Sequence, residues 1–432
     1  MLGDTPLYNL KAVIQETGLG PETLRAWEHR YGLPRPQRSP GGHRLYSKDD
    51  IEMLKWLVAR QKEGLSISHA VEMWRNLEKA GQNPTQQTQS TTQVLNVSGS
   101  TLDDLRNGWV TACLAFDEQT AERTLSQAFA IDSPEIVCTE VLQKGLAEIG
   151  ERWYQGLISV QQEHFTSALT MRRINILFSA APPPTRPEHI LAACPPGEEH
   201  EFSLLLAAFL LRRRGWDVVY LGANVPLSQL DETLRVNSPS LILSVAQTIA
   251  STASLRKMAE YVYAQGVPMV YGGGIFTLCP AITERIPGYY LGNEVAAIPQ
   301  IVEHLLAMRP PLPIPLPISP EYQQTMATFV ENEARIIAYV TQAMQPDQLE
   351  PAHLDKAISY FSRDIISSLS LGDIHFLDPS VGWLLGLLEN HGLSPSLARR
   401  YFTVYSQAVQ RYLGSHGVPI LDWFTKVGYP RR

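Results

Sequence analysis

One histidine of this chain is placed where an imidazole could bind a metal. His200 follows Glu198 and Glu199 in the segment CPPGEEHEFSLLL, which has the pattern of a loop between a strand and a helix. A neutral imidazole in such a loop can bind a soft transition metal, and a nearby carboxylate can hold it in one tautomer. Glu198, two residues earlier, is suited to this orienting role.

A second group of polar and aromatic residues lies upstream, in the segment RWYQGLISVQQEHFTSALTMRR. Trp153 is followed ten residues later by Glu163 and His164. Taken alone, each histidine is more often an ordinary polar residue, His200 of a loop and His164 of a helix N-terminus. Their combination is harder to assign to chance.

The elements that must position His200 alternate between strands and helices. Apolar, β-rich runs predict strands at 189–194, 217–222, 241–246 and 267–273, and amphipathic patterns predict helices at 202–214, 227–236 and 251–265. Such alternation predicts a parallel sheet with right-handed crossovers. Ligands of these sheets bind beyond the carboxyl ends of the strands, where the loop of His200 is expected.

The rest of the chain divides at segments of biased composition. A Gln/Thr/Ser-rich stretch at 81–100 and a proline-dense stretch at 309–320 predict a flexible linker and a semi-rigid spacer. Helices are expected near 102–115, 117–130, 134–155 and 160–179, which would form a four-helix bundle over 101–182. Residues 321–432 predict an all-helical domain, with helices at 321–344, 353–370, 380–390 and 394–414.

Composition excludes several classes of protein. No apolar run approaches the roughly 20 residues of a membrane span, and no signal-peptide pattern opens the chain, so a cytoplasmic protein without membrane contact is expected. The four cysteines lie far apart, which argues against disulfides and thiolate metal sites. The net charge is −7, but residues 25–48 hold six basic side chains against one acidic, a local footprint suited to phosphates.

The first 80 residues predict a DNA-reading domain. Gly20 ends a turn between two helices, and Pro21 opens the second, which would project Thr23, Arg25 and His29. Gly41 and Gly42 would form the tip of a two-stranded wing. A helical hairpin with solvated arginines is the alternative on spacing alone.

The residues LRAWEHRYGLPRPQRSPGGHRLYS closely resemble the winged helix of the MerR family. The resemblance covers about the first 75 residues and implies a dimer on pseudo-palindromic operator DNA. Trp27 would pack in the core. The positions that match DNA-facing residues of the family are Arg25, Tyr31, Arg38, Arg44 and Tyr46.

Residues 101–308 resemble the cobalamin-binding module of the CarH/LitR light-dependent regulators. The resemblance implies a Rossmann-like domain at 188–308 in which His200 is the lower ligand of cobalt, displacing the nucleotide tail of the cofactor. That tail would pass small residues, namely Ser244, Gly272, Gly273 and Gly274. Trp153, Glu163 and His164 would cover the upper face, where the adenosyl group of adenosylcobalamin is carried.

Two residues depart from the family pattern. Ser203 stands where a glycine is usual, and Tyr154 stands where light-dependent members have a histidine that binds cobalt after photolysis. A phenol is a much poorer ligand than an imidazole at neutral pH, and His164 is the available substitute.

The combined prediction is a repressor controlled by adenosylcobalamin and light, acting as a homo-oligomer, either a dimer or a tetramer. The alternatives are a light-independent cobalamin sensor, or a photoreceptor with a second chromophore, bilin or haem, in residues 321–432. A thioether-linked bilin in that block is excluded, since no cysteine follows Cys279. An enzyme would need a catalytic domain for which no segment is evident, and a metal-sensing MerR protein usually needs clustered thiolates.

Overall fold

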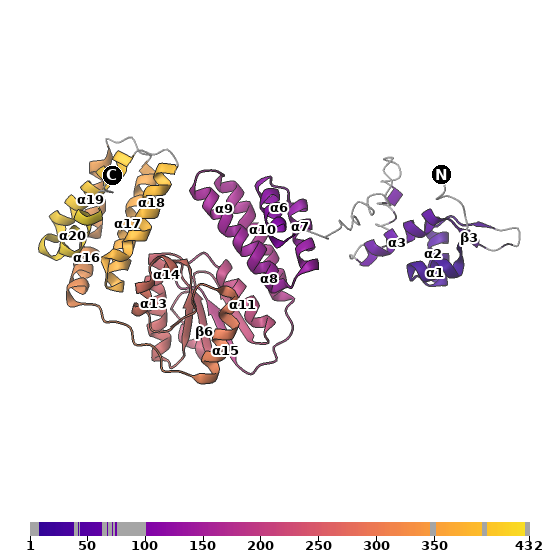
Figure 1. The fold of residues 1–432 in the computed structure, drawn as a ribbon, viewed down its shortest axis with the longest axis horizontal. Coiled ribbons are helices and arrows are strands. Elements are labelled where there is room, and N and C mark those ends of the chain that lie inside the picture. Colours follow the sequence, from indigo (N-terminus) through magenta and orange to yellow (C-terminus); the bar gives the residue numbers. More distant parts are fainter. Residues whose placement is uncertain are drawn as a thin grey trace. The chain divides into compact units, whose positions relative to one another are not determined.

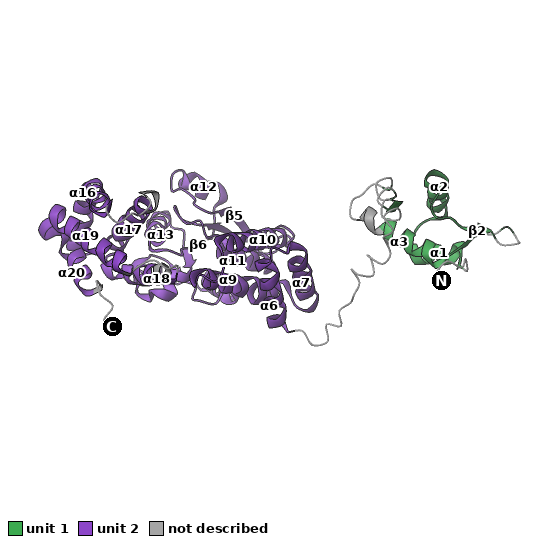
Figure 2. Cartoon of the chain, turned by 90° about the horizontal axis from the view of Figure 1, so that it is seen from above, with its two compact units in different colours: residues 1–99 green, residues 100–432 purple. Residues whose placement is uncertain are grey.

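The computed structural model describes residues 8–38, 42, 44–62, 67, 71, 74–75, 101–345, 351–390 and 395–427. Two compact units divide the chain, one over Met1–Gly99 and one over Ser100–Arg432 (Figure 2). The predicted linker at 81–100 lies outside the described residues, as does Gly41 at the predicted wing tip.

The first unit has the predicted helix-turn-helix and wing. Helix α1 (Leu10–Thr17) ends at Gly18, whose φ of 71° is the left-handed conformation that glycine tolerates, and α2 (Pro21–Tyr31) begins after Gly20. Strands β2 (Gln37–Arg38) and β3 (Arg44–Tyr46) pair antiparallel, and α3 (Lys48–Lys62) follows. A third strand, β1 (Tyr8–Asn9), pairs with β3 and was not predicted, because two residues are too short for a periodic signal.

The second unit begins with the predicted four-helix bundle. Its helices are α6 (Leu102–Leu114), α7 (Glu118–Ile131), a helical run over 134–154, and α10 (Val160–Ser179). The run consists of α8 (Pro134–Val137), a π-helical segment (Cys138–Gln143) and α9 (Lys144–Tyr154). Ser133 caps its start and Pro134 occupies the first turn, so the helix begins at this point of the chain.

A five-stranded parallel sheet follows, in the order β5-β4-β6-β7-β8. All four predicted strands are present, as β4 (His189–Ala193), β5 (Asp217–Gly222), β6 (Leu241–Val245) and β7 (Met269–Gly272). The edge strand β8 (Tyr289–Tyr290) was missed, being only two residues long. The connecting helices are α11 (Phe202–Arg213), α12 (Leu230–Asn237), α13 (Ile249–Ala264), α14 (Gly274–Leu278) and α15 (Ile298–Met308).

The two faces of the sheet enter different hydrophobic cores. Ile190 and Leu243 pack with α11 and with bundle residues such as Trp109, so the bundle shares one core with the sheet. Leu191 and Ile242, which point to the other face, pack with α13. Buried Leu371 of the C-terminal block belongs to this second core.

The C-terminal block is all-helical in the residues that the structure describes, as predicted. Its helices are α16 (Pro320–Met344), α17 (Pro351–Leu371), α18 (Asp378–Asn390), α19 (Pro395–Leu413) and α20 (Val418–Val427), the last of which was not predicted. Of these, α17 lies beside α13 (Figure 1). Aromatic rings fill the core, with Phe361 against Tyr405 at 4.9 Å between centroids. Arg256 of α13 donates to the carbonyl of Ser370 at 3.2 Å.

The proline-dense run at 309–319 contains no helix or strand, as a spacer requires. Hydrogen bonds hold it against the preceding domain. The Leu316 N–H donates to the Glu284 carbonyl at 2.8 Å, the Tyr289 hydroxyl to the Pro310 carbonyl at 2.6 Å, and the Arg285 guanidinium to the Pro317 carbonyl at 3.3 Å. It therefore runs along the sheet domain between β8 and α16.

The cysteines are unpaired, and burial raises the pKa of Cys113, Cys138 and Cys194 to about 12. These three thiols are therefore protonated at neutral pH. In the part of the chain that the structure describes, no helix has the length and apolar character needed to cross a bilayer.

Candidate functional site

The loop after β4 holds His200 by a buried carboxylate. Glu198 is 1% exposed, and its Oε1 lies 2.8 Å from Nδ1 of His200 and accepts from the His200 N–H at 2.9 Å. The other oxygen, Oε2, accepts from the Gln247 N–H and from the Ser251 hydroxyl, each at 2.6 Å. Every lone pair that faces the protein is thus used to fix the carboxylate.

This arrangement prepares Nε2 of His200 for a ligand. With Nδ1 facing a carboxylate, the neutral ring carries its proton on Nδ1 and its free lone pair on Nε2. The side chain of His200 is 71% exposed, so that lone pair is open to a ligand at the carboxyl edge of the sheet. The predicted orienting role of Glu198 agrees with this geometry.

The ionisation of the pair follows from the same contacts. Burial alone raises the pKa of Glu198, but hydrogen bonds from His200 and Ser251 outweigh it and hold the pKa below its usual range. The hydrogen bond to Glu198 raises the pKa of His200, and the negative charge of Glu163 adds to that rise. Glu163 of the bundle therefore lies near enough to His200 to act on it electrostatically.

The three upper-face candidates lie at one end of the bundle. Trp153 is half-buried in the last turn of α9, and Glu163 and His164 occupy the first turn of α10. Glu163 accepts from Ser167 at 2.6 Å, and its second oxygen lies 2.6 Å from Nδ1 of His164. His164 is 74% exposed, so its Nε2 is also open to a ligand.

The small residues predicted along the nucleotide tail differ in what surrounds them. A Cβ on Gly272 would meet nothing within 4 Å, so the chain has open space beside this residue. Gly273 has a φ of 127°, and a Cβ there would overlap the carbonyl of Ala246. The Gly274 N–H donates to Gln247 at 2.7 Å. Ser244 is fully buried, and its hydroxyl already donates to the Ala193 carbonyl at 2.7 Å.

Gln247 and Ser251 are site residues that the sequence reasoning missed. Both hold Glu198, and the Gln247 side chain also donates to the Ser203 hydroxyl at 3.0 Å. The serine that departs from the family glycine thus has a defined partner. The available signal was the position of Gln247 directly after the buried strand β6, at the edge where ligands of parallel sheets bind.

The DNA-facing candidates mostly lie on the surface of the first unit. Thr23 and Arg25 are exposed on α2, Arg38 is exposed on β2, and Tyr31 is half-buried at the end of α2. Arg44 of β3 forms an ion pair with Glu28 of α2 at 3.0 Å, which ties the wing to the second helix. Trp27 is buried, as predicted.

Tyr46 is placed differently from its predicted role. It is only 2% exposed and belongs to the core of the first unit, where burial raises the pKa of its hydroxyl. Arg44 and Tyr46 lie on one side of β3, and the ring of Tyr46 is buried in a core that residues of α1, α2 and α3 share, so Tyr46 supports the wing from within.

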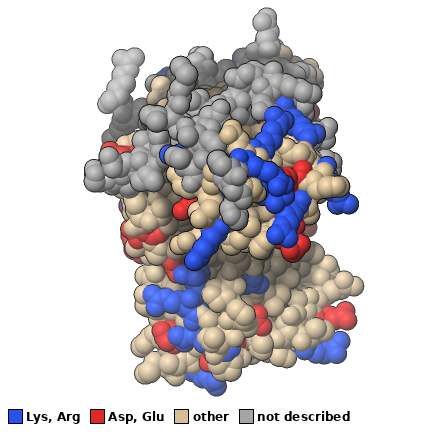
Figure 3. All heavy atoms as spheres, turned by 90° about the vertical axis from the view of Figure 1, so that its right-hand side faces the viewer, with Lys and Arg blue, Asp and Glu red and all other residues tan. Residues whose placement is uncertain are grey.

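The surface chemistry of α2 suits a polyanion. A hollow of about 820 Å³ lies along this helix, lined by Arg25, His29, Arg30 and Arg44 among others. Lys and Arg side chains gather on part of the face shown in Figure 3, with Asp and Glu side chains among them. The lining of the hollow along α2 includes three arginines, Arg25, Arg30 and Arg44, and two glutamates, Glu22 and Glu28.

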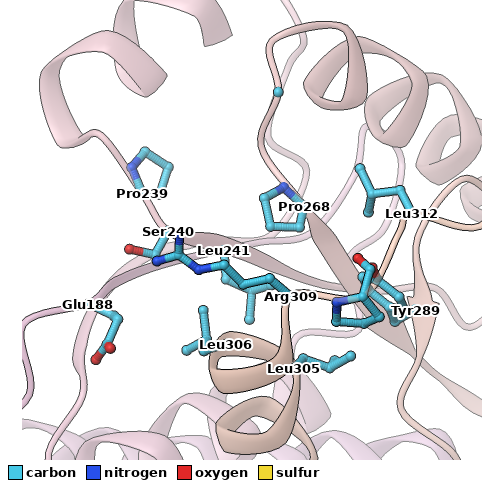
Figure 4. A pocket seen from close by; sticks show the side chains of 12 residues that line it. Glu188, Pro239, Ser240, Leu241, Pro268, Tyr289, Leu305, Leu306, Arg309 and Leu312 are labelled. Atoms are coloured by element: carbon cyan, nitrogen blue, oxygen red, sulfur yellow. The ribbon is translucent and has the colours of Figure 1, made fainter.

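Another hollow lies at the opposite edge of the sheet. About 400 Å³ in volume, it is lined by residues that precede the strands, such as Glu188 before β4 and Pro268 before β7, and by Leu305 and Arg309 (Figure 4). It is separate from the carboxyl edge that carries His200, and ligands of open parallel sheets bind at that carboxyl edge.

Comparisons with known proteins identify the families of both regions. Residues 8–77 match the family model of MerR HTH family regulatory proteins, and residues 105–178 and 188–302 match two models of B12 binding domains. The predicted domain types are thereby confirmed.

Individual relatives extend this likeness over most of the chain. The HTH-type transcriptional repressor CarH of Myxococcus xanthus is 31% identical over 299 residues, covering 66% of this chain and 95% of the relative. The repressor CarA of the same organism is 33% identical, covering 51% of this chain and 70% of the relative. A monomethylamine corrinoid protein of Methanosarcina barkeri is 15% identical with a TM-score of 0.41, over 48% of this chain and 100% of that one. The chain belongs to the CarH family of cobalamin-binding, MerR-type transcriptional regulators.

Proposed function

We propose that this chain is a repressor whose affinity for operator DNA is set by adenosylcobalamin and by light. The observation that supports this most is the exposed imidazole of His200, held at the carboxyl edge of the sheet by buried Glu198. A single neutral imidazole with a fixed tautomer is what a lower axial ligand of cobalt requires.

The surrounding residues fit the remaining parts of the cofactor. The open space beside Gly272 leaves room for a nucleotide tail, whereas Ser244 would line its path with backbone and not with a free hydroxyl. Trp153, Glu163 and His164 would lie over the upper face. When bound, adenosylcobalamin supplies a cobalt–carbon bond that light can break.

The chain's own part in the response lies in the contacts of the bundle. Glu163 and Trp153 would hold the bundle against the ligand-bearing edge of the sheet in the dark. Loss of those upper-face contacts would let α9 and α10 move and weaken a homo-oligomer. Because two or more winged helices on one DNA raise avidity by effective concentration, a weaker oligomer binds DNA less well.

The test uses the full chain, loaded with adenosylcobalamin in darkness. Size by chromatography and affinity for DNA fragments selected from a randomised library are measured before and after green light. We expect light to lower the oligomer size and to weaken DNA binding on the order of 100-fold.

Two other results would change the conclusion. Equal binding of adenosyl-, methyl- and hydroxocobalamin, with no effect of light on size or DNA affinity, would establish a sensor of cobalamin supply. A change of size or DNA affinity on illumination of the chain without cobalamin would point to a second chromophore in residues 321–432. Of the four histidines there, the structure describes the side chains of His375 and His416, and both lie at the surface.

We further propose that Thr23, Arg25, Tyr31, Arg38 and Arg44 contact operator DNA. Arg38→Ala should weaken binding about five- to tenfold for all DNA sequences and reduce the slope of log affinity against log salt by about one, since a phosphate contact carries no sequence information. Arg235→Ala in α12, whose side chain is 76% exposed outside the winged helix, is the matched control. An unchanged salt slope in Arg38→Ala would contradict the assignment.

A further inference from the structure

The C-terminal helical block touches the bundle at the end of α9, beside Trp153. The ring of Trp383 in α18 stacks on Tyr154 at 5.7 Å between centroids and 25° between planes. The same ring lies 6.1 Å from Trp153 at 33°. Asn390 donates its side-chain amide to the carbonyl of Tyr154 at 3.0 Å. The last turn of a helix has carbonyls without helical partners, so Asn390 caps α9 from another domain.

The close approach depends on a glycine in α18. A Cβ on Gly386 would overlap the hydroxyl of Tyr154. Glycine at this position leaves room for the phenol of Tyr154 beside α18. Tyr154 stands where light-dependent members of the family have a histidine, and here its side chain packs against α18.

The two partners in this contact are anchored on opposite faces of the sheet. The bundle is fixed on the α11 side, where Arg213 pairs with Glu135 at 2.8 Å and the Arg212 guanidinium lies 3.7 Å from the Phe178 ring centroid. The C-terminal block is fixed on the α13 side through Leu371 and the hydrogen bond from Arg256. The contact of Tyr154 with Trp383 thus closes a ring of domains around the carboxyl edge of the sheet.

A hollow beside the histidine loop places the C-terminal block near the same edge. It measures about 350 Å³ and is lined by Gly197 of that loop, by Lys257 of α13, and by Glu333 and Ser367 of the C-terminal block. Gly197 is three residues before His200 in the sequence. The block therefore borders the loop that would carry the lower ligand as well as the helix that carries Trp153.

We infer that the C-terminal block is a third wall of the cobalamin site and that Trp383 determines specificity for the group on the upper face of cobalt. This inference rests on the proposed role of Trp153 over that face. Trp153, whose ring is held by Trp383, would present a fixed surface to the purine of an adenosyl group. It would therefore lose less conformational entropy on binding. A small upper group, such as hydroxide, gains nothing from that surface.

The test compares Trp383→Ala with Trp383→Phe, and uses Tyr360→Ala as the control. Tyr360 is an exposed aromatic residue of the same block, in α17. In the chain without cofactor, Trp383→Ala should raise amide hydrogen exchange in the last turn of α9 about tenfold. In darkness it should weaken adenosylcobalamin binding about five- to tenfold and change hydroxocobalamin binding less than twofold. Trp383→Phe should retain most of both properties, and Tyr360→Ala should resemble the unchanged chain.

Each other result overturns the inference. Unchanged amide hydrogen exchange in Trp383→Ala would mean that Trp383 does not stabilise the end of α9. An equal loss of affinity for adenosylcobalamin and hydroxocobalamin would mean that Trp383 does not discriminate between their upper groups. The proposed light response has a separate test. It would be refuted if the chain without substitutions binds both cobalamins but keeps its size and its DNA affinity under green light. The Trp383 comparison would remain valid in that case.

Discussion

His200→Ala is expected to weaken cobalamin binding about 10- to 100-fold and to abolish the absorption spectrum of histidine-bound cobalt. The reason is geometric: His200 has an exposed imidazole ring that is fixed by Glu198, so its removal would take away the proposed lower ligand of cobalt. Titration of purified chain with adenosylcobalamin in darkness, followed by absorption, measures both quantities.

His189→Ala is the matched control for this substitution. His189 begins β4, is 52% exposed and lies 3.0 Å from Asp217, so it too is an exposed histidine beside a carboxylate, but it lies at the opposite edge of the sheet from His200. Its loss should leave the spectrum and the affinity unchanged. Retention of normal affinity and of the histidine-bound spectrum in His200→Ala would refute the ligand assignment.

Glu198→Gln examines the carboxylate without removing the ligand. A neutral amide cannot accept charge-assisted hydrogen bonds from His200, Ser251 and the Gln247 N–H together, so the ring loses its fixed tautomer. Cobalamin affinity should fall about tenfold, less than in His200→Ala. A loss as large as that of His200→Ala would show that Glu198 mainly supports the fold of the loop.

Gly273→Ala is expected to destabilise the sheet domain by about 3 kcal/mol. Its φ of 127° and ψ of 159° lie in a region that is open almost only to glycine, and the new methyl group would overlap the backbone carbonyl of Ala246. Chemical denaturation of the chain without cofactor measures the loss. A destabilisation below 1 kcal/mol would mean that β6 and the turn after β7 separate easily.

Gly272→Ala is the neighbouring control and also tests the path of the nucleotide tail. Because a Cβ there meets nothing within 4 Å, stability without cofactor should change by less than about 0.5 kcal/mol. If the tail passes this backbone, the same methyl group should nevertheless weaken cobalamin binding. Unchanged affinity in a stable Gly272→Ala chain would place the tail elsewhere.

Sequence alone determined the features that depend on neighbouring residues. Gly20 and Pro21 set the turn and the start of α2, Ser133 and Pro134 set the start of the 134–154 helical run, and apolar runs located four strands of the sheet. Parallel strands bring their carboxyl ends to one edge of the sheet, and this rule predicts that the loop of His200 lies at that edge. The short strands β1 and β8 were not predicted, because each has two residues and carries no periodic signal.

Tertiary structure decided the features that join residues far apart in the chain. Tyr46 is buried in a core shared with α1, α2 and α3, Glu198 accepts a hydrogen bond from Ser251 some fifty residues later, and Trp153 lies beside Trp383. No local pattern specifies such pairs, because burial, desolvation and ring stacking arise only when separate elements pack together. The strand and helix pattern thus predicted the place of the His200 loop, the family resemblance implied its role as a ligand, and only the packing shows that Gln247 and Ser251 hold the carboxylate beside it.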